Sequence, residues 1–408
     1  MLERLARLQR NAVTIYRETG SARAAIHYLR KLILAKTSLL GVHLRIFSIR
    51  MMPWKMAAER KRMASLRRDG AMVLAVTVSG GVGDLIVIAR FMRDLAANAE
   101  PFAFDVFVAR PDVAQWIFGA IPGFSGAFPD SLESLALRHH DLELRIHQGL
   151  SLQRVRASKQ RQNQAPNLLR ILDSIQNSAT AREMAPFLKL HPRSDNGLAQ
   201  RAVLAGRTRK DLLHGIADIA YGGDAMDISN DEEVLVRTGL KNKDFITIHN
   251  GFDTNFIIRG PRATKCYPHF HRVVTIMKAA RPELVFVQIG TTTSEPIPDV
   301  DFNLIGQTSL EQAAALLHAS QLHLDNEGGL VHLAACYGRR SLVVFGPTPS
   351  NYFGYSNNIN INPLKCGNCW WMDDLWMDRC RLGMREPECM LTQPPENLAA
   401  LALRALSK

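Results

Sequence analysis

Short apolar runs recur along this chain, and the segments between them have helical spacing. Residues 73–78 (Val-Leu-Ala-Val-Thr-Val) form a continuous β-branched run, as expected of a strand buried on both faces of a parallel sheet. Residues 85–95 show apolar positions at helical spacing. We expect further strands at 104–108, 245–249, 284–289, 322–324, 342–345 and 359–361. Together these segments predict an α/β fold.

Two other segments carry weaker signals. Residues 307–317 predict a helix, and Thr308-Ser309-Leu310-Glu311 is typical of a capped helix start. Residues 138–210 are rich in His, Arg, Gln and Ser, and predict mostly polar helix and loop.

Two glycine-rich turns each follow a predicted strand and precede a helix. They are residues 79–84 (Ser-Gly-Gly-Val-Gly-Asp) and 325–329 (Asp-Asn-Glu-Gly-Gly). The first turn has the spacing of neither a P-loop nor the dinucleotide fingerprint. Glycines let the backbone approach a ligand closely, and the N–H groups at a helix start suit a phosphate. The alternative is an ordinary strand-to-helix turn.

The second turn begins a longer motif. His332-Leu333-Ala334 follows it, and a predicted strand then ends in Phe345-Gly346-Pro347-Thr348. This motif resembles the C-terminal signature of glycosyltransferase family 9, the family of the ADP-heptose:lipopolysaccharide heptosyltransferases. Asn326 and Glu327 depart from the Asp-Thr that the family carries before its glycine. The resemblance implies the GT-B architecture, in which two Rossmann-like doubly wound domains face a cleft.

The first turn also resembles this family, in its N-terminal Gly-Asp motif. The resemblance implies that the Asp84 carboxylate is the general base and that Gly83 lies at the donor. The alternative is that Asp84 caps the helix that follows and accepts from its first N–H groups. The two roles are compatible.

A third matching segment contains Thr264, Lys265 and Pro268, with Tyr267 in place of the family's Trp. A lysine and a hydroxyl can neutralise and bond a leaving diphosphate. We therefore expect the donor to be held by Thr264, Lys265, Glu327, Gly328, Gly329 and His332, with Gly83 opposite them. The alternatives are a solvated basic loop for Lys265 and a buried structural histidine for His332.

The charge of the chain is concentrated at one end. Residues 1–70 hold sixteen Lys and Arg against four Asp and Glu, which accounts for the whole formal net charge of +12. Apolar positions at helical spacing predict a basic helical extension, without a signal peptide or a membrane-spanning run. Such a helix suits an anionic membrane surface, or it packs as an arm on the enzyme or a partner subunit. Sparse aromatics and the lack of a binding motif disfavour nucleic acid.

Four of the six cysteines fall near the C-terminus, at Cys366, Cys369, Cys380 and Cys389. Four thiols can close a tetrahedral site for zinc or iron. The alternatives are reduced structural thiols, or disulfides in an oxidising compartment. We expect a structural metal and no cofactor for catalysis. Some members of the resembled family bind iron and glycosylate proteins.

The length of 408 residues predicts more than one domain. We expect an extension at 1–70, an acceptor domain at 71–235, a nucleotide-sugar domain at 240–365, and a Cys-rich knuckle with a helix at 366–408. The resemblance implies an inverting, metal-independent transfer of a heptose-like sugar to a cell-surface glycan, in the cytoplasm or on the inner face of the membrane. A sugar-nucleotide epimerase and a non-catalytic binding protein are the alternatives.

Overall fold

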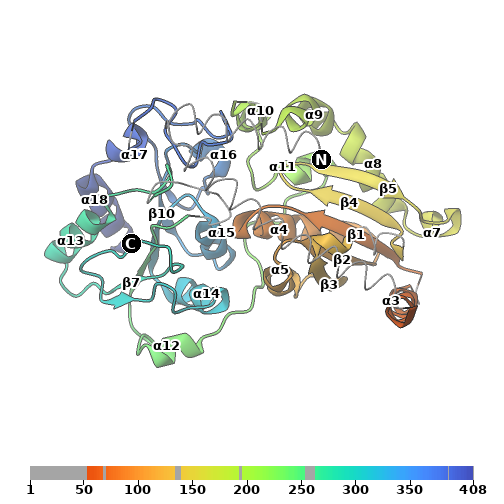
Figure 1. The fold of residues 1–408 in the computed structure, drawn as a ribbon, viewed down its shortest axis with the longest axis horizontal. Coiled ribbons are helices and arrows are strands. Elements are labelled where there is room, and N and C mark those ends of the chain that lie inside the picture. The colour runs from red at the N-terminus through yellow and green to blue at the C-terminus, as the bar shows by residue number, and fades with distance from the viewer. Residues whose placement is uncertain are drawn as a thin grey trace, which may run out of the picture.

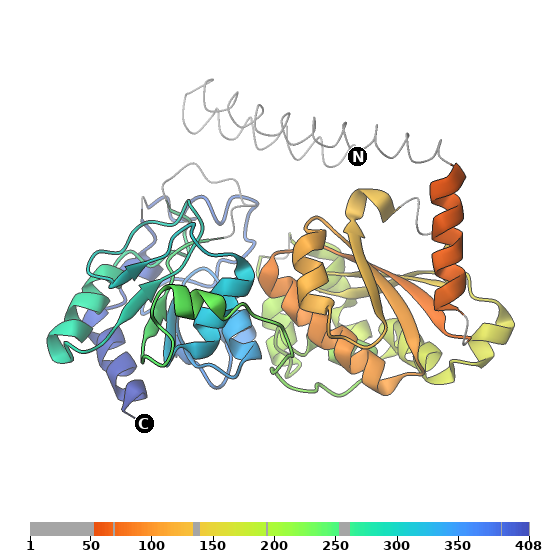
Figure 2. The same cartoon turned by 90° about the horizontal axis from the view of Figure 1, so that it is seen from below.

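The computed structural model describes residues 53–67, 70–133, 139–192, 195–252, 262–384 and 386–407. The expected basic extension therefore lies largely outside the described residues. Its described end is helix α3 (Pro53–Leu66), which stands beside the first sheet (Figure 2). Arg62 of this helix pairs with the fully buried Asp105 at 2.5 Å.

The first sheet has five strands in the order β3-β2-β1-β4-β5. Strand β1 lies at the centre, parallel to β2 and β4, while the edge strand β5 runs antiparallel to β4. The central strand is buried along almost its whole length because helices cover both faces of the sheet. The strands are β1 (Met72–Val78), β2 (Phe102–Val108), β3 (Phe124–Pro129), β4 (Leu142–Ile146) and β5 (Leu150–Val155).

The second sheet has six strands in the order β11-β10-β9-β6-β7-β8, and all of its pairs are parallel. Its order reverses between β6 and β9, the kind of position at which open α/β sheets bind ligands. The strands are β6 (Ile246–Ile248), β7 (Phe286–Gln288), β8 (Phe302–Asn303), β9 (Leu322–Asn326), β10 (Ser341–Val344) and β11 (Ile359–Ile361).

Side chains that alternate along β10 enter two different cores. Leu342 and Val344 pack with helices α13 (Phe270–Ala280) and α18 (Pro395–Leu406). Val343 joins the opposite core, which includes α14 (Leu310–Ala319) and α15 (Gly329–Cys336). Each face of the second sheet is thus covered by helices, as the doubly wound prediction requires.

The opposite core continues into the first sheet through helix α4 (Val82–Asn98). This helix is buried nearly all round, because the first sheet covers one side and α15 packs on another. Figure 1 shows α4 and α15 side by side between the two sheets. A continuous apolar core therefore fixes the starts of these two helices relative to each other.

Other helices cover the outer part of the first sheet. Helix α5 packs on β2 and β3, and α8 and α11 pack on β5. The remaining helices of this part and of the link to the second sheet are short. Their bounds are α5 (Pro111–Phe118), α7 (Lys159–Asn163), α8 (Pro166–Asn177), α9 (Ala179–Leu190), α10 (Gly197–Leu204), α11 (Leu212–Ala217) and α12 (Glu233–Arg237).

Two of the secondary-structure predictions were wrong in part. Residues 138–210 contain β4 and β5 besides helices. Strand β5 is the polar edge of the sheet, and its Arg154 faces Glu143 of β4 across the antiparallel pair. Helix α14 is capped by Ser309 with Gln312, rather than by Thr308 with Glu311. No helix in the described ranges is long and apolar enough to span a membrane.

Candidate functional site

The two glycine turns meet where α4 and α15 begin. A Cβ on Gly83 would lie 2.6 Å from Cδ2 of the His332 ring, and a Cβ on Gly329 would lie 3.2 Å from Cβ of Val82. Any larger residue at Gly83 would force the ring or the helix to move. Glycine is therefore needed here for close approach between segments that are some 250 residues apart in the chain.

Asp84 lies in the first turn of α4 and both caps the helix and faces other segments. Its Oδ2 accepts from the Gly81 amide at 3.2 Å, and its Oδ1 accepts from Arg209 Nη2 at 2.7 Å and from Gln148 Nε2 at 3.3 Å. The carboxylate retains about a quarter of its exposure. Burial raises its pKa, but Arg209 and neighbouring groups outweigh burial, so the pKa falls below its usual value. The group is therefore ionised at neutral pH.

Arg209 was missed by the sequence analysis. It links Asp84 to the segment between strands β10 and β11 of the second sheet. Its side chain is almost fully buried, its Nη2 also donates to the His147 carbonyl at 3.1 Å, and its amide donates to the Tyr352 carbonyl at 2.8 Å. Nη1 is buried without a partner in the described residues. Arg209 stands 125 positions from Asp84, and no local pattern marks it.

The expected donor-binding residues divide into two groups. Lys265 Nζ lies 3.4 Å from Glu327 Oε2, and both side chains are about one-eighth exposed. Thr264 is buried, and its hydroxyl donates to the Trp376 carbonyl at 2.6 Å. Thr264 thus anchors the C-terminal segment, whereas Lys265 and Glu327 stay at the loop beside α15.

The residues before α15 also have structural roles. The Asn326 Oδ1 accepts from the Tyr267 amide at 2.7 Å and so fixes the Lys265 loop. Counting back from His332, Glu327 occupies the aspartate position of the family motif and Gly328 the threonine position, one residue later than the sequence reading placed them. A carboxylate is therefore retained there, and the hydroxyl is lost. Among the described residues, a Cβ on Gly328 would have only a backbone oxygen at 3.9 Å, so this part of the structure leaves space at the helix start.

His332 is buried at the junction of the two turns. Its Nδ1 lies 2.6 Å from the Tyr355 hydroxyl. Burial, followed by the charge of Arg90, lowers its pKa to about 3. The ring is therefore neutral at physiological pH, with Asp84 and Lys265 among the charges that act on it.

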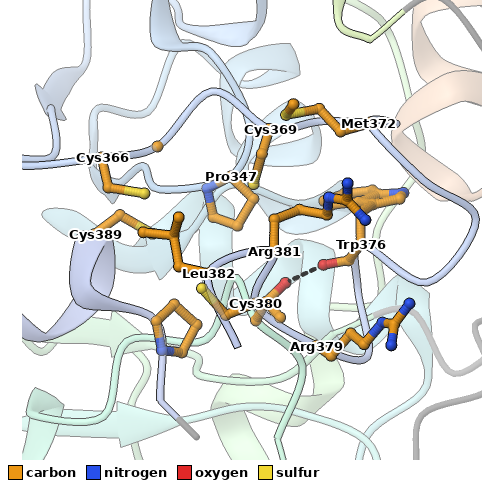
Figure 3. Close-up of a pocket in the computed structure, with 13 residues that line it drawn as sticks. Pro347, Cys366, Cys369, Met372, Trp376, Arg379, Cys380, Arg381, Leu382 and Cys389 are labelled. Carbon is orange, nitrogen blue, oxygen red and sulfur yellow. Dashed lines mark hydrogen bonds between the residues drawn. The ribbon is translucent and has the colours of Figure 1, made fainter. Parts of the chain in front are cut away.

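The four C-terminal cysteines line one pocket of about 150 Å³, together with Pro347 and Trp376 (Figure 3). None of the four forms a disulfide among the residues that the structure describes. Burial, followed by the charges of the other three thiols, raises the pKa of Cys389 to about 12. Cys366, Gly367 and Asn368 all have positive φ, so the chain turns sharply into the pocket.

The donor set of this pocket is soft, which suits zinc or iron. Across the described residues, however, no three His, Cys, Asp or Glu side chains are grouped as a metal site. The pocket thus brings the four thiols together without the spacing of a closed site. A metal there would require the thiols to draw closer.

Two sheets, one parallel and one parallel except for its edge strand β5, have helices on both faces and meet at two glycine turns. This arrangement defines a two-domain Rossmann-like protein of the GT-B type. Residues 256–372 match the sequence profile of Glycosyltransferase family 9 (heptosyltransferase). Over this segment, which is less than a third of its length, the chain is similar to the heptosyltransferases of glycosyltransferase family 9, so the predicted resemblance is confirmed, and the predicted fold class is confirmed as well.

A curated relative is Lipooligosaccharide heptosyltransferase 2 of Haemophilus influenzae. It is 28% identical over 100 residues, which cover 22% of this chain and 29% of the relative. The chain therefore matches less than a third of that protein's length.

Two solved structures share the fold. A family 9 glycosyltransferase from Veillonella parvula has a TM-score of 0.50 at 12% identity, over 82% of this chain and 97% of its own. The iron-containing dodecameric glycosyltransferase TibC from enterotoxigenic E. coli has a TM-score of 0.50 at 13% identity, over 83% and 76%. At these identities the likeness concerns the fold alone.

Proposed function

We propose that this protein is an inverting glycosyltransferase that moves a heptose-like sugar from a nucleotide-activated donor to an acceptor hydroxyl. The observation that carries this proposal is the junction of the two glycine turns. An ionised carboxylate, Asp84, and a cation, Lys265, both act on the same neutral histidine there. A base and a diphosphate-binding group are what such a transfer requires.

In this reaction Asp84 takes the proton of the acceptor hydroxyl as its oxygen attacks the anomeric carbon. The bond from that carbon to the diphosphate breaks, and its electron pair leaves with the nucleoside diphosphate. Attack opposite the leaving group in one step inverts the anomeric centre. A positioned base typically contributes 10²–10⁴-fold.

Lys265 and the start of α15 neutralise the leaving diphosphate. In the free protein Glu327 pairs with Lys265. Once the diphosphate has replaced Glu327 at Lys265, the Glu327 carboxylate accepts hydrogen bonds from hydroxyl groups of the donor. The proposal assigns charge neutralisation to these groups, without a catalytic metal. Residues 71–235 would then bind the acceptor and residues 240–365 the donor.

The identity of the donor and acceptor is drawn from relatives. One TibC structure is a complex with ADP-D-beta-D-heptose. The curated relative is named a lipooligosaccharide heptosyltransferase. We extend ADP-heptose and a lipopolysaccharide-type or related glycan acceptor to this chain as the working assignment. Action in the cytoplasm, with residues 1–70 on anionic lipid, completes the proposal.

The direct test measures nucleotide release. Purified protein with ADP-heptose should release ADP only when a glycan acceptor is present, and proton NMR of the product should show an inverted anomeric centre. Change of the sugar nucleotide without any acceptor would indicate an epimerase. Binding without release in the presence of every acceptor would indicate a non-catalytic protein.

A screen of melting temperatures narrows the donor before that assay. ADP and ADP-heptose should raise the melting temperature more than UDP or GDP at equal concentration, because a ligand that binds the native state stabilises it by mass action. Equal shifts for all the nucleotides would contradict the ADP assignment.

We also propose that the four-cysteine pocket holds a structural zinc or iron ion. Cys366, Cys369, Cys380 and Cys389 would supply the ligands, and the ion would stabilise the segment that Thr264 anchors. Elemental analysis of protein never exposed to chelator should give about one equivalent of metal, lost in the Cys369→Ser variant. Less than about a tenth of an equivalent in the wild type contradicts the site.

A further inference from the structure

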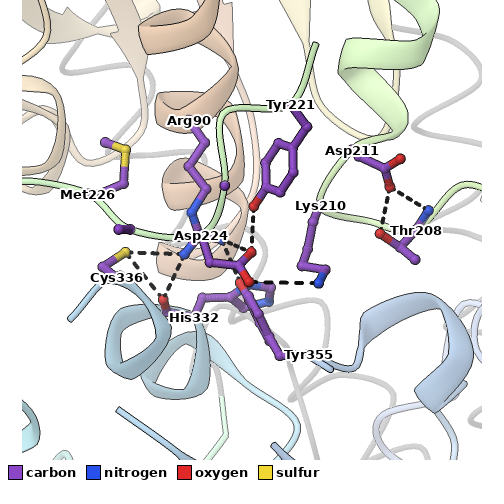
Figure 4. Close-up of polar contacts among 12 residues, drawn as sticks. Arg90, Thr208, Lys210, Asp211, Tyr221, Asp224, Met226, His332, Cys336 and Tyr355 are labelled. Atoms are coloured by element: carbon purple, nitrogen blue, oxygen red, sulfur yellow. Dashed lines mark hydrogen bonds and ion pairs between the residues drawn. The ribbon is translucent and has the colours of Figure 1, made fainter. Parts of the chain in front are cut away.

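Helix α4 carries a fully buried arginine at the boundary between the two sheets. Arg90 Nη1 donates to the Tyr355 hydroxyl at 2.7 Å, and Nη2 approaches the His332 carbonyl and the Cys336 sulfur at 3.4 Å each. Asp224 lies 3.9 Å away and supplies a negative charge. Figure 4 shows this group between α4 and α15. The fold thus retains a costly buried cation beside the candidate site.

The hydrogen bonds of this group fix where one proton lies. A guanidinium only donates, so the Tyr355 oxygen is the acceptor from Arg90. The hydroxyl has one proton to donate, and in the described residues its other hydrogen-bond partner is Nδ1 of His332, 2.6 Å away, so we assign the proton to that contact. Burial raises the pKa of Tyr355, so this proton stays on the tyrosine. Nδ1 is therefore the unprotonated nitrogen of the ring.

A neutral imidazole carries one proton, so here it sits on Nε2. A Cβ on Gly83 would lie 3.2 Å from this nitrogen, which places Nε2 at the first turn of α4, against the residue that precedes Asp84 in the chain. In the described parts of the chain, the hydrogen bond of this ring is the one at Nδ1. Nε2–H is thus presented where the two glycine turns meet.

We infer that Arg90 and Tyr355 are positioning residues that hold His332 as a neutral Nε2–H donor, and that this donor binds a diphosphate oxygen of the nucleotide sugar. The ligand in this inference rests on the proposed function, whereas the tautomer follows from hydrogen-bond geometry. His332 then serves as a hydrogen-bond donor, and proton removal is left to Asp84.

The tautomer can be measured without any substrate. In protein labelled with ¹⁵N-histidine, long-range proton–nitrogen correlations distinguish a protonated ring nitrogen from an unprotonated one. The resonances absent from the His332→Gln variant identify His332. We expect Nε2 protonated and Nδ1 unprotonated at pH 7. An Nδ1–H tautomer or an imidazolium overturns the inference.

Two amide replacements test the role of Nε2–H in binding. The glutamine amide of His332→Gln reaches the position of Nε2, whereas the asparagine amide of His332→Asn reaches that of Nδ1. For ADP binding by calorimetry we expect His332→Gln within about threefold of wild type and His332→Asn weaker by roughly 10- to 100-fold, the effect of one hydrogen bond to a charged group. The reverse order, or an equal loss in two variants with native melting temperatures, overturns the binding role.

A matched pair of hydroxyl deletions tests the relay. Tyr355→Phe should give mixed tautomers of His332 and weaker ADP binding. Tyr337→Phe removes a hydroxyl that donates to the Ile228 carbonyl and should change neither. Wild-type tautomer and affinity in Tyr355→Phe overturn the relay. If wild-type protein fails to bind ADP, the proposed donor class fails, while the nitrogen spectra still decide the tautomer.

Discussion

On each side of the junction of the two glycine turns, a carboxylate pairs with a cation, but the two pairs differ in distance and burial. Asp84 and Arg209 lie 2.7 Å apart, with the arginine almost fully buried. Glu327 and Lys265 lie 3.4 Å apart, with both groups partly exposed. The first pair has further hydrogen bonds from Gln148 and the Gly81 amide.

Because the two pairs differ in distance and burial, we expect them to have different roles although each combines one carboxylate with one cation. A close pair with a buried arginine holds its carboxylate in one place and keeps it ionised. A long pair at a loop gives up its contact readily when an anionic ligand arrives, since partly exposed ion pairs contribute little. The first pair therefore suits a positioned base, and the second suits a site that exchanges Glu327 for diphosphate.

The largest expected effect is on the carboxylate of the first pair. Asp84→Asn should reduce kcat by about 10²–10⁴-fold, because the base is lost while the side chain keeps its shape. Binding of ADP, measured by calorimetry, should stay near wild type. Near wild-type turnover in this variant would remove Asp84 from the mechanism.

A change in the second pair, Lys265 and Glu327, should alter the affinity for ADP. Lys265→Met should weaken ADP binding by roughly 10- to 100-fold, since a charge-assisted hydrogen bond to phosphate is lost. Lys278→Met is the matched control, because Lys278 pairs with Asp301 on the surface. Equal affinity of both variants would mean that Lys265 belongs to a solvated loop.

Glu327→Gln sharpens the same comparison. If the diphosphate replaces Glu327 at Lys265, removing the competing charge should leave ADP affinity equal to wild type or a few-fold tighter, about 1 kcal/mol at most. Calorimetry with ADP measures this change. A loss of affinity as large as that of Lys265→Met would contradict the exchange.

The first pair should also set the acidic limb of the pH profile. Arg209 lowers the pKa of Asp84, and a protonated Asp84 is inactive as a base. Arg209→Lys weakens this effect, so the pKa should rise and the acidic limb of kcat/KM should move to higher pH. Arg207→Lys, at an arginine that is just over a third exposed and paired with Asp211, should leave the limb in place.

Asp94 on the same helix is a structural counterpart of Asp84. Burial raises its pKa, but His214, Arg93 and the Gly222 amide outweigh burial and lower it to about 2. This depressed value contributes about 2 kcal/mol of folding stability above pH 4, which is lost as the pH falls toward 2. Asp94→Asn should therefore lower the free energy of unfolding at pH 7 by a similar amount, and the difference from wild type should shrink toward pH 2.

Urea unfolding at pH 7 and pH 3 measures this difference, and residual activity under native conditions serves as the control. Asp94 contacts His214 and Arg93 rather than the junction. Turnover per folded molecule should therefore stay close to wild type. A loss of turnover as large as that of Asp84→Asn would show that both carboxylates of α4 serve the reaction.

The sequence predicted the elements whose pattern is local. The run at 73–78 became β1, and the apolar spacing from Leu85 to Leu95 lies within α4. The strand β4 and the edge strand β5 were missed because their polar residues pair across the ladder or face solvent, which removes the continuous apolar signal. Asp84 and Lys265 could be proposed from short motifs, whereas Arg209, Tyr355 and Arg90 have no motif around them.

The sequence by itself therefore determined the α/β class, the two glycine turns and the residues that resemble a family motif, because these depend on neighbours a few positions apart. Only the tertiary structure decided which charged and polar side chains lie in contact with one another. Arg209 reaches Asp84 across 125 positions and Arg90 reaches Tyr355 across 265. Such partners are chosen by the packing of α4 against α15, and burial then turns those contacts into shifted pKa values and a fixed tautomer.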